Sequence, residues 1–519
     1  MTKDEYSLKN ISAKQKKNSR PNPSFFLINM KDNIKLLYID LFCGAGGTST
    51  GVEMANLNNS KCAKVIACVN HDKNAIASHL ANHPDAMHFT EDIRTLDLTG
   101  LKEHVKNQHT LYPDAKIVLW ASLECTNFSR AKGGLPRDAD SRTLAEHLFR
   151  YIDEINPDYI QIENVEEFMS WGDLDESGKP VSKDAGRLYM LWVNKICRRG
   201  YYFDFRILNA ANYGAYTSRK RFFGIFAKKH LPIVFPEPTH EKNPKESMFG
   251  CLKPWMPVKD ILDLSNEGIS IFDRKKPLVD ATLERINAGL IKFVAGGKDA
   301  FLSKQFGGDP SGKNISIEQP AGAVTCRDHH ALITVKKNEK VCFIDMQYGN
   351  GTPTSVEGPA MTITRNPKHR LITVVQETTS EDIFLMNPQF GCEGASIERP
   401  CFTLIAKMDK KPPYLINTAT NSSRPSFIRE ENGCLIYEIY ETDSEIVKKI
   451  KEFMARYGKQ DIKMRMLDEM ELKMIMGFPR DYVLIGTQAD RKKFIGNAVV
   501  TLIPKAWAET LSATLTKAS

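Results

Sequence analysis

A cysteine and a glutamate stand where their side chains could act on one substrate. Cys125 lies three residues beyond the apolar run AKIVLWAS (115–122), and Glu163 lies near the end of the run PDYIQIEN (157–164). Both runs predict buried parallel strands, whose carboxyl ends meet at one edge of a sheet. A thiolate at that edge can add to a ring carbon while a carboxylic acid protonates the ring. The alternative for Cys125 is simple burial, because free cysteine is among the most buried residue types.

A glycine-rich turn indicates a cofactor site. The segment IKLLYIDLFCGAGG (34–47) predicts a buried strand that runs into this turn, which is the opening unit of a doubly wound α/β domain. Its G-A-G-G spacing differs from G-x-G-x-x-G and disfavours a nicotinamide or flavin cofactor, and with it an oxidoreductase. Two further predicted strands lead to Asn70, Asp72 and Asp92, where a ribose would bind. This favours S-adenosylmethionine, which has a ribose and no pyrophosphate, although helix caps and turns are the alternative for each residue.

Two arginines occur close together in TSRKRFFGIF (217–226). Side chains alternate along a strand, so Arg219 and Arg221 face one side and Lys220 the other. Two guanidinium groups on one side suit a pyrimidine carbonyl oxygen or a flanking phosphate, and the alternative is a solvated face. With the thiol, the acid and the methyl donor, they favour methyl transfer to carbon 5 of cytosine, a poor nucleophile until a thiolate adds to carbon 6.

Six segments resemble, in the same order, motifs of the DNA cytosine-5 methyltransferase family of bacteria and phages. They are DLFCGAGG (40–47), ECTNFS (124–129), ENV (163–165), TSRKRFFGIF (217–226), RMLDEMELKMIMGFP (465–479) and IGNAVV (495–500). The resemblance implies a Rossmann-like α/β methyltransferase domain, Cys125 as the nucleophile, and Glu163, Arg219 and Arg221 as further catalytic residues. The cofactor residues that it implies are Asp40, Phe42, Gly44, Gly46, Gly47, Asn70, Asp72, Asp92, Ile93, Asn497 and Val499.

The chain departs from the family pattern at three places. Leu123 and Glu124 precede the cysteine where the family usually has a proline pair, and a carboxylate close to the thiol would raise its pKa. Thr217 replaces the common glutamine before the two arginines. Asn70 stands where an acidic residue usually holds the ribose, and Asp72 is the candidate substitute.

The middle of the chain contains three related units. Gln-aromatic-Gly heads begin at residues 305, 347 and 389, and S-[IV]-E-x-P tails begin at 316, 355 and 396. A period near 40 residues indicates an internal repeat, and each unit predicts a strand, a loop, a proline turn and further strands. Loops such as CRDHHA and RNPKHR carry donors suited to base edges and phosphates. We therefore expect an inserted β-rich target-recognition domain, with a purely structural β array as the alternative.

The predicted organisation has four parts. Residues 1–30 form a mobile basic tail, 31–240 the first part of the catalytic domain, 241–464 the target-recognition domain, and 465–519 the return that completes the catalytic domain. The net charge of +8 permits a polyanionic partner. The eleven cysteines include no C-x-x-C pair, which disfavours disulfides and a zinc ribbon, so no metal is expected. No apolar run is long enough to span a membrane.

We expect a monomer in the bacterial cytoplasm, associated with the nucleoid through duplex DNA. A restriction endonuclease that acts on the same site is a further expected partner. The alternative functions are a tRNA cytosine-5 methyltransferase, which has less use for a large base-reading insert, and a catalytically inactive DNA-binding scaffold.

Overall fold

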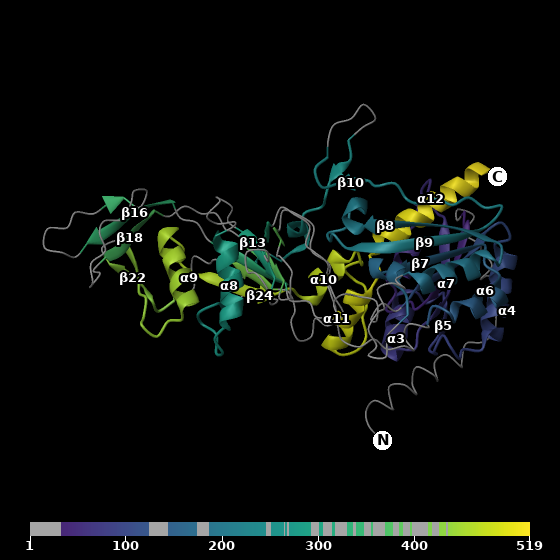
Figure 1. Ribbon diagram of the computed structural model, residues 1–519, viewed down its shortest axis with the longest axis horizontal. Coiled ribbons are helices and arrows are strands. Elements are labelled where there is room, and N and C mark those ends of the chain that lie inside the picture. Colours follow the sequence, from purple (N-terminus) through teal and green to yellow (C-terminus); the bar gives the residue numbers. More distant parts are fainter. Residues whose placement is uncertain are drawn as a thin grey trace, which may run out of the picture.

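The computed structural model (Figure 1) describes residues 33–123, 144–173, 186–244, 251–291 without 264, 267 and 268, 425–431 and 434–518. Between residues 300 and 417 it describes only the backbones of individual strands. Cys125, Glu124 and the expected N-terminal tail lie outside the described residues. Among the described helices, none has both the length and the apolar character needed to cross a membrane.

A seven-stranded sheet forms the centre of the domain that the sequence predicts to be catalytic. Its strands, in spatial order, are β5 (Met87–Phe89), β4 (Ala63–Val69), β1 (Leu36–Leu41), β6 (Lys116–Ser122), β7 (Tyr159–Asn164), β9 (Lys220–Lys228) and β8 (Tyr201–Asn209). The first five are parallel, whereas β9 and β8 form an antiparallel hairpin at the edge. The strand order reverses between β1 and β6, which is where open α/β sheets bind ligands. The doubly wound Rossmann-like fold is therefore present.

Alternate residues of the strands pack on opposite faces of this sheet. Leu36 and Tyr38 belong to a core that includes Trp507, whereas Leu37 and Ile39 belong to the opposite core. The helices are α2 (Gly47–Glu53), α3 (Lys73–Asn82), α4 (Leu98–Leu111), α6 (Leu148–Ile155), α7 (Arg187–Cys197), α10 (Glu469–Ile475), α11 (Gln488–Asn497) and α12 (Leu502–Ala518). Figure 1 shows the C-terminal α12 lying against the domain built by the N-terminal half. This helix packs against α2, so both ends of the described chain contribute to one domain.

The insert contains two sheets. The larger is built from β12 (Ile269–Ser270), β24 (Ile462–Met466), β15 (His330–Val335), β21 (Tyr414–Asn417), β19 (Ile383–Asn387), β13 (Ala300–Lys304), β14 (Asn314–Ser316) and β20 (Ala395–Ser396). The smaller contains β17 (Thr354–Ser355), β16 (Glu339–Met346), β18 (His369–Gln376), β23 (Cys434–Tyr437) and β22 (Ile428–Glu431). The remaining elements are β2 (Asn56–Leu57), β3 (Ser60–Lys61), β10 (His240–Glu241), β11 (Lys253–Pro254), α8 (Asp280–Gly289), α9 (Glu445–Arg456) and the short helices η3 (Glu166–Ser170), η5 (Ala210–Tyr213) and η6 (Val258–Ile261).

Each of the three repeats has the same strand pattern. The first strand of the unit pairs antiparallel with both following strands, in β13–β14–β15, β16–β17–β18 and β19–β20–β21. The serine that begins each S-[IV]-E-x-P tail pairs with a phenylalanine of the first strand, as in Phe301 with Ser316. The first and third repeats share the larger sheet, and the second forms the smaller one.

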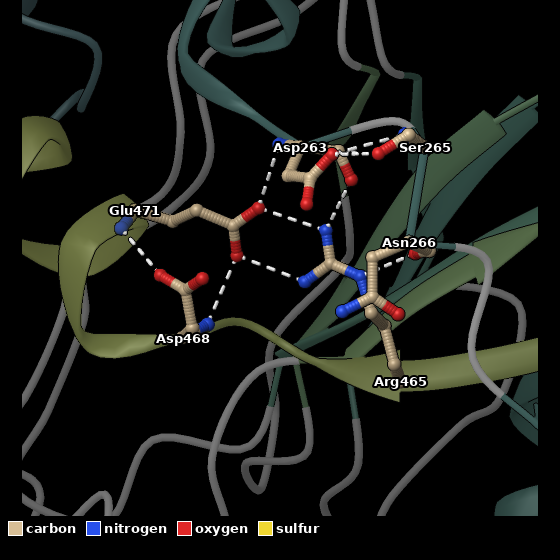
Figure 2. Close-up of polar contacts among 6 residues, drawn as sticks. All are labelled: Asp263, Ser265, Asn266, Arg465, Asp468 and Glu471. Atoms are coloured by element: carbon tan, nitrogen blue, oxygen red, sulfur yellow. Dashed lines mark hydrogen bonds and ion pairs between the residues drawn. The ribbon is translucent and has the colours of Figure 1, made fainter.

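A buried ion pair joins the insert's larger sheet to helix α10 (Figure 2). Strand β24 crosses the predicted boundary at residue 464, so Arg465 lies in the larger sheet and not only in the C-terminal return. Arg465 of β24 donates two hydrogen bonds to Glu471 of α10, from Nη1 to Oε2 at 2.9 Å and from Nη2 to Oε1 at 2.8 Å. The same guanidinium donates to the carbonyls of Asp263 and Asn266 at 2.7 and 2.6 Å. Glu471 also closes a capping box with Asp468, which fixes the start of α10. The Arg465 guanidinium therefore holds together strand β24, helix α10 and the loop that contains Asp263 and Asn266.

Candidate active site

Glu163 lies at the carboxyl end of β7, beside the end of β6. Its Cα pairs with Ser122 on one side and with Phe223 on the other. The residue is only 7% exposed, and its Oε1 is 3.5 Å from Nε of Arg221. Burial raises the pKa of Glu163, and the charges of Arg221 and Arg219 oppose that rise. A carboxyl group in this setting can hold a proton and release it to a substrate.

Arg221 of β9 lies on the Glu163 side, and Arg219 immediately precedes this strand; the charges of both arginines act on Glu163. Arg219 is buried and donates from Nη1 to the carbonyl oxygen of Gly496 at 3.3 Å. Arg221 retains partial exposure in its side chain, while Lys220 between them is exposed. One arginine therefore reaches the C-terminal return, and the other contacts the acid directly.

The predicted nucleophile is not among the residues that the structure describes. The chain leaves β6 at Ser122 and Leu123, next to Glu163, and Cys125 follows two residues later in the sequence. The fold thus brings the end of the strand that leads to Cys125 to the acid. The effect of the Leu123–Glu124 departure also lies outside the described part, except that Leu123 itself is buried.

The glycine-rich loop has one open side and one covered side. Gly44 has φ +53°, and a Cβ added there would meet nothing within 4 Å. Gly46 has φ +100°, and a Cβ there would lie 2.3 Å from the Tyr482 hydroxyl. At Gly47 the added atom would lie 2.5 Å from the Val499 carbonyl oxygen. The covered side therefore requires glycine, and the open side leaves room for a ligand.

Tyr482 fixes this loop from the C-terminal return. Its hydroxyl donates to the carbonyl oxygen of Ala45. Sequence reasoning missed this residue, which lies three positions after the GFP of the 465–479 motif and has no distinctive local pattern. Phe42, at the start of the turn, has φ +58°, a conformation that few non-glycine residues adopt.

Asp40 is completely buried on β1. One carboxylate oxygen accepts a hydrogen bond from Ser49 Oγ at 2.7 Å, and the other, Oδ1, has no partner among the described residues. Burial raises the pKa of Asp40 to about 8. Sequence reasoning missed Ser49, whose position in the first turn of α2 carries no motif.

The polar residues after the next strands have different surroundings. Asn70 is half-buried, and its side chain accepts from the backbone of Asp72 at 2.9 Å. Asp72 caps α3 through Asn74 and Ala75, and its other oxygen is 3.4 Å from Nζ of Lys493. Asp72 is therefore a helix cap, which is the alternative to ribose binding, and its second oxygen forms an ion pair with Lys493.

The third strand end contributes Asp92 and Ile93. Both carboxylate oxygens of Asp92 bind Arg94, and these hydrogen bonds lower the pKa of Asp92 to about 2. Ile93 is buried, and its carbonyl oxygen accepts from the Tyr151 hydroxyl at 3.0 Å.

The C-terminal motif completes the predicted site. Asn497 ends α11 and is exposed, whereas Val499 is buried against Gly47. Thr217 is fully buried, and nothing in the structure explains why it stands in place of glutamine.

Comparisons with known proteins agree with this architecture. The model of a family described as C-5 cytosine-specific DNA methylase matches residues 36–276 and 372–513. The chain is 30% identical over 253 residues to Type II methyltransferase M.AgeI of Thalassovita gelatinovora, covering 46% of this chain and 53% of that protein. It is 32% identical over 205 residues to Type II methyltransferase M.XorII of Xanthomonas oryzae, covering 39% and 43%. The chain therefore spans about half the length of these curated relatives.

Proposed function

The chain belongs to the C-5 cytosine-specific DNA methylase family, and we propose that it methylates carbon 5 of a cytosine in a specific duplex DNA site. The observation that carries this proposal is the group formed by Glu163, Arg219 and Arg221 at the strand end next to the segment that leads to Cys125. A carbon inside stacked DNA is out of reach of this edge, so the target cytosine must be flipped out, at a cost of a few kcal/mol.

The chemistry follows from the residue types. The Cys125 thiolate adds to carbon 6 of the ring, and Glu163 gives its proton to nitrogen 3, which makes carbon 5 nucleophilic. Bound S-adenosylmethionine supplies an electrophilic methyl group to that carbon. Loss of the carbon-5 proton to a base then expels the cysteine and restores the ring. Burial favours the protonated acid before the reaction, and the arginine charges favour the carboxylate after it.

The predicted cofactor residues lie at the edge of the sheet where the parallel strands end, called here the cofactor edge, and they fit S-adenosylmethionine. The loop is open at Gly44, and a buried oxygen of Asp40 has no partner among the described residues. We assign Asp40, Phe42, Gly44, Gly46, Gly47, Asn70, Asp92, Ile93, Asn497 and Val499 to this edge. Asp72 serves it indirectly, because its side chain holds the start of α3 beside Asn70.

The insert is proposed to choose the cytosine. Its three repeats share a strand framework, so their loops can vary while the framework stays constant. Removing one base contact costs about 1–3 kcal/mol, which relaxes one position of the site. We further propose a monomer that acts on the chromosome in the cytoplasm, with a restriction endonuclease of the same site as partner. A family model of DNA methylases and the large insert favour DNA over tRNA.

The decisive experiment is covalent trapping. Duplex DNA that contains 5-fluorocytosine should capture the wild-type protein, because fluorine does not leave as the carbon-5 proton does. Cys125→Ser should bind the same DNA without forming the adduct, and Cys197→Ser is the matched control that should still be trapped. Mass spectrometry of the adduct should locate it at Cys125. An adduct at another cysteine contradicts the nucleophile assignment, and cofactor binding without turnover on any duplex favours the scaffold alternative.

A second experiment tests the insert. Residues 300–415 are exchanged for the corresponding insert of a related enzyme, and methylation-sensitive sequencing then gives the modified motif. An active chimera should acquire the donor's motif. If it keeps the original motif, the bases are recognised outside the repeats.

A further inference from the structure

Two cysteines and a histidine converge beneath the glycine-rich loop. Cys43 belongs to that loop, Cys68 to β4 and His79 to α3, and all three are buried. Their ligand atoms, the two Sγ atoms and a ring nitrogen, lie within 4.8 Å of one another. None of these residues has a role in the proposed methyl transfer. Thiolate and imidazole ligands in such a group favour zinc among the common divalent metals.

The orientation of His79 is set by hydrogen bonds. Its Nε2 is 2.8 Å from Ser49 Oγ, and Ser49 donates its hydroxyl hydrogen to Asp40. With Asp40 as the carboxylate, the serine oxygen accepts from His79, so Nε2 carries the proton and Nδ1 offers its lone pair to an ion. That lone-pair nitrogen is 3.6 Å from Cys68 Sγ. Zinc-binding histidines are commonly held by such a partner on the second ring nitrogen.

A fourth candidate ligand lies on the neighbouring strand, next to the three atoms that are within 4.8 Å of one another. Nε2 of His88, from β5, is 2.9 Å from Nδ1 of His79. The nearby His83 points elsewhere, since its Nε2 lies 3.1 Å from Thr50 Oγ1. His88 is half-buried, whereas the other three residues are buried, so His88 is the member of the group most exposed to solvent.

Two of the ligand separations can be compared with those around a tetrahedral ion. Zinc–sulfur bonds of about 2.3 Å and zinc–nitrogen bonds of about 2.05 Å place sulfur and nitrogen ligands about 3.6 Å apart, and two nitrogens about 3.3 Å apart. The Cys68–His79 separation of 3.6 Å already has this value. The His79–His88 separation of 2.9 Å must widen by about 0.4 Å, a small side-chain movement for a half-buried ring.

We propose that Cys43, Cys68, His79 and His88 bind one structural Zn²⁺ ion beneath the cofactor loop. Two thiolates balance the charge of the ion, so the buried group is neutral as a whole. The ion links the loop after β1, the strands β4 and β5 and the helix α3. Predicted cofactor residues lie in that loop and in the segments that follow the two strands. The absence of a C-x-x-C pair predicts no zinc ribbon, but the parallel pairing of β1 and β4 brings distant cysteines together.

Metal analysis of the full-length protein tests this proposal without reference to activity. The wild type, purified after growth with zinc, should contain about one zinc per chain, the content of one such site. Replacement by Co²⁺ should give thiolate charge-transfer absorption and the visible bands of tetrahedral cobalt. Cys68→Ser and His79→Gln should lose the ion, whereas Cys62→Ser, at an equally buried cysteine outside the group, should retain it.

A variant can also lose zinc because it fails to fold, so a second measurement is made on the wild-type protein. X-ray absorption at the zinc edge should show two sulfur and two nitrogen neighbours. Wild type without zinc, zinc retained by Cys68→Ser, oxygen-only coordination, or a Cys43–Cys68 disulfide in the protein purified under reducing conditions would each overturn the proposal.

Discussion

Arg465→Met should uncouple the insert from helix α10. Methionine keeps much of the side-chain volume but removes the two hydrogen bonds to Glu471 and those to the carbonyls of Asp263 and Asn266. The Glu471 carboxylate has a side chain that is 3% exposed. Among the described residues, its remaining donors are then the backbone amides of Asp263 and Asp468. Breaking one partner out of a buried pair costs about 3–5 kcal/mol, because the remaining charge stays buried without its counterion.

Native-state hydrogen exchange of the α10 amides measures this cost locally. A loss of about 3 kcal/mol corresponds to exchange that is faster by roughly 100-fold or more. Adding Glu471→Gln to Arg465→Met should restore part of the protection, because the buried charge is gone. Lys102→Met breaks the exposed Lys102–Glu154 pair and should leave exchange unchanged.

The same variant should acquire a characteristic pH dependence. Burial raises the pKa of Glu471, and Arg465 lowers it, so the variant has a higher pKa at this carboxyl than the wild type. The folded variant then holds a proton that the unfolded chain releases, and its stability rises as the pH falls toward about 4. Unchanged α10 exchange, or a cost that does not shrink on acidification, would refute a buried charge as the cause.

Three further predictions concern the catalytic domain. Gly46→Ala should abolish S-adenosylmethionine binding in calorimetry, since its Cβ would lie 2.3 Å from the Tyr482 hydroxyl, whereas Gly100→Ala, with open space, should bind normally. Glu163→Gln should slow tritium release from carbon-5-labelled DNA by roughly 100-fold without changing cofactor affinity; an unchanged rate moves the acid role elsewhere. Because the pKa of Asp40 is about 8, folding stability should fall as pH rises from about 4 to 8, and thermal melts of Asp40→Asn should lack this part of the dependence.

Apolar runs and strand alternation predict much of the catalytic domain. The runs that end near Asn70 and Glu163 form β4 and β7 of one sheet, with β1 and β6 between them. The charges of Arg219 and Arg221 both act on Glu163, as alternation predicts for two arginines on one side. Asp72 shows the limit of such inference. An aspartate after a strand is equally suited to a ribose and to a helix cap, and only the start of α3 decides that it caps.

Contacts between distant parts of the chain have no local signal. The three repeats are visible in the sequence, but their equivalent strands can pair in several ways, because the side-chain period of two is common to all of them. The structure places the first and third repeats in one sheet through His330 with Asn387 and Leu332 with Leu385. The convergence of Cys43, Cys68 and His79 is likewise set by the sheet order.

The C-terminal return connects three parts of the molecule, and this constrains how the insert can be exchanged. Tyr482 holds the glycine-rich loop, Gly496 accepts a hydrogen bond from Arg219 beside Glu163, and Arg465 lies in the insert's larger sheet while binding α10. An exchange that ended inside β24 would remove the buried ion pair and change catalysis and recognition together. Exchange of residues 300–415 leaves β24 and its ion pair in place, so a change of motif in that chimera can be attributed to the repeats themselves.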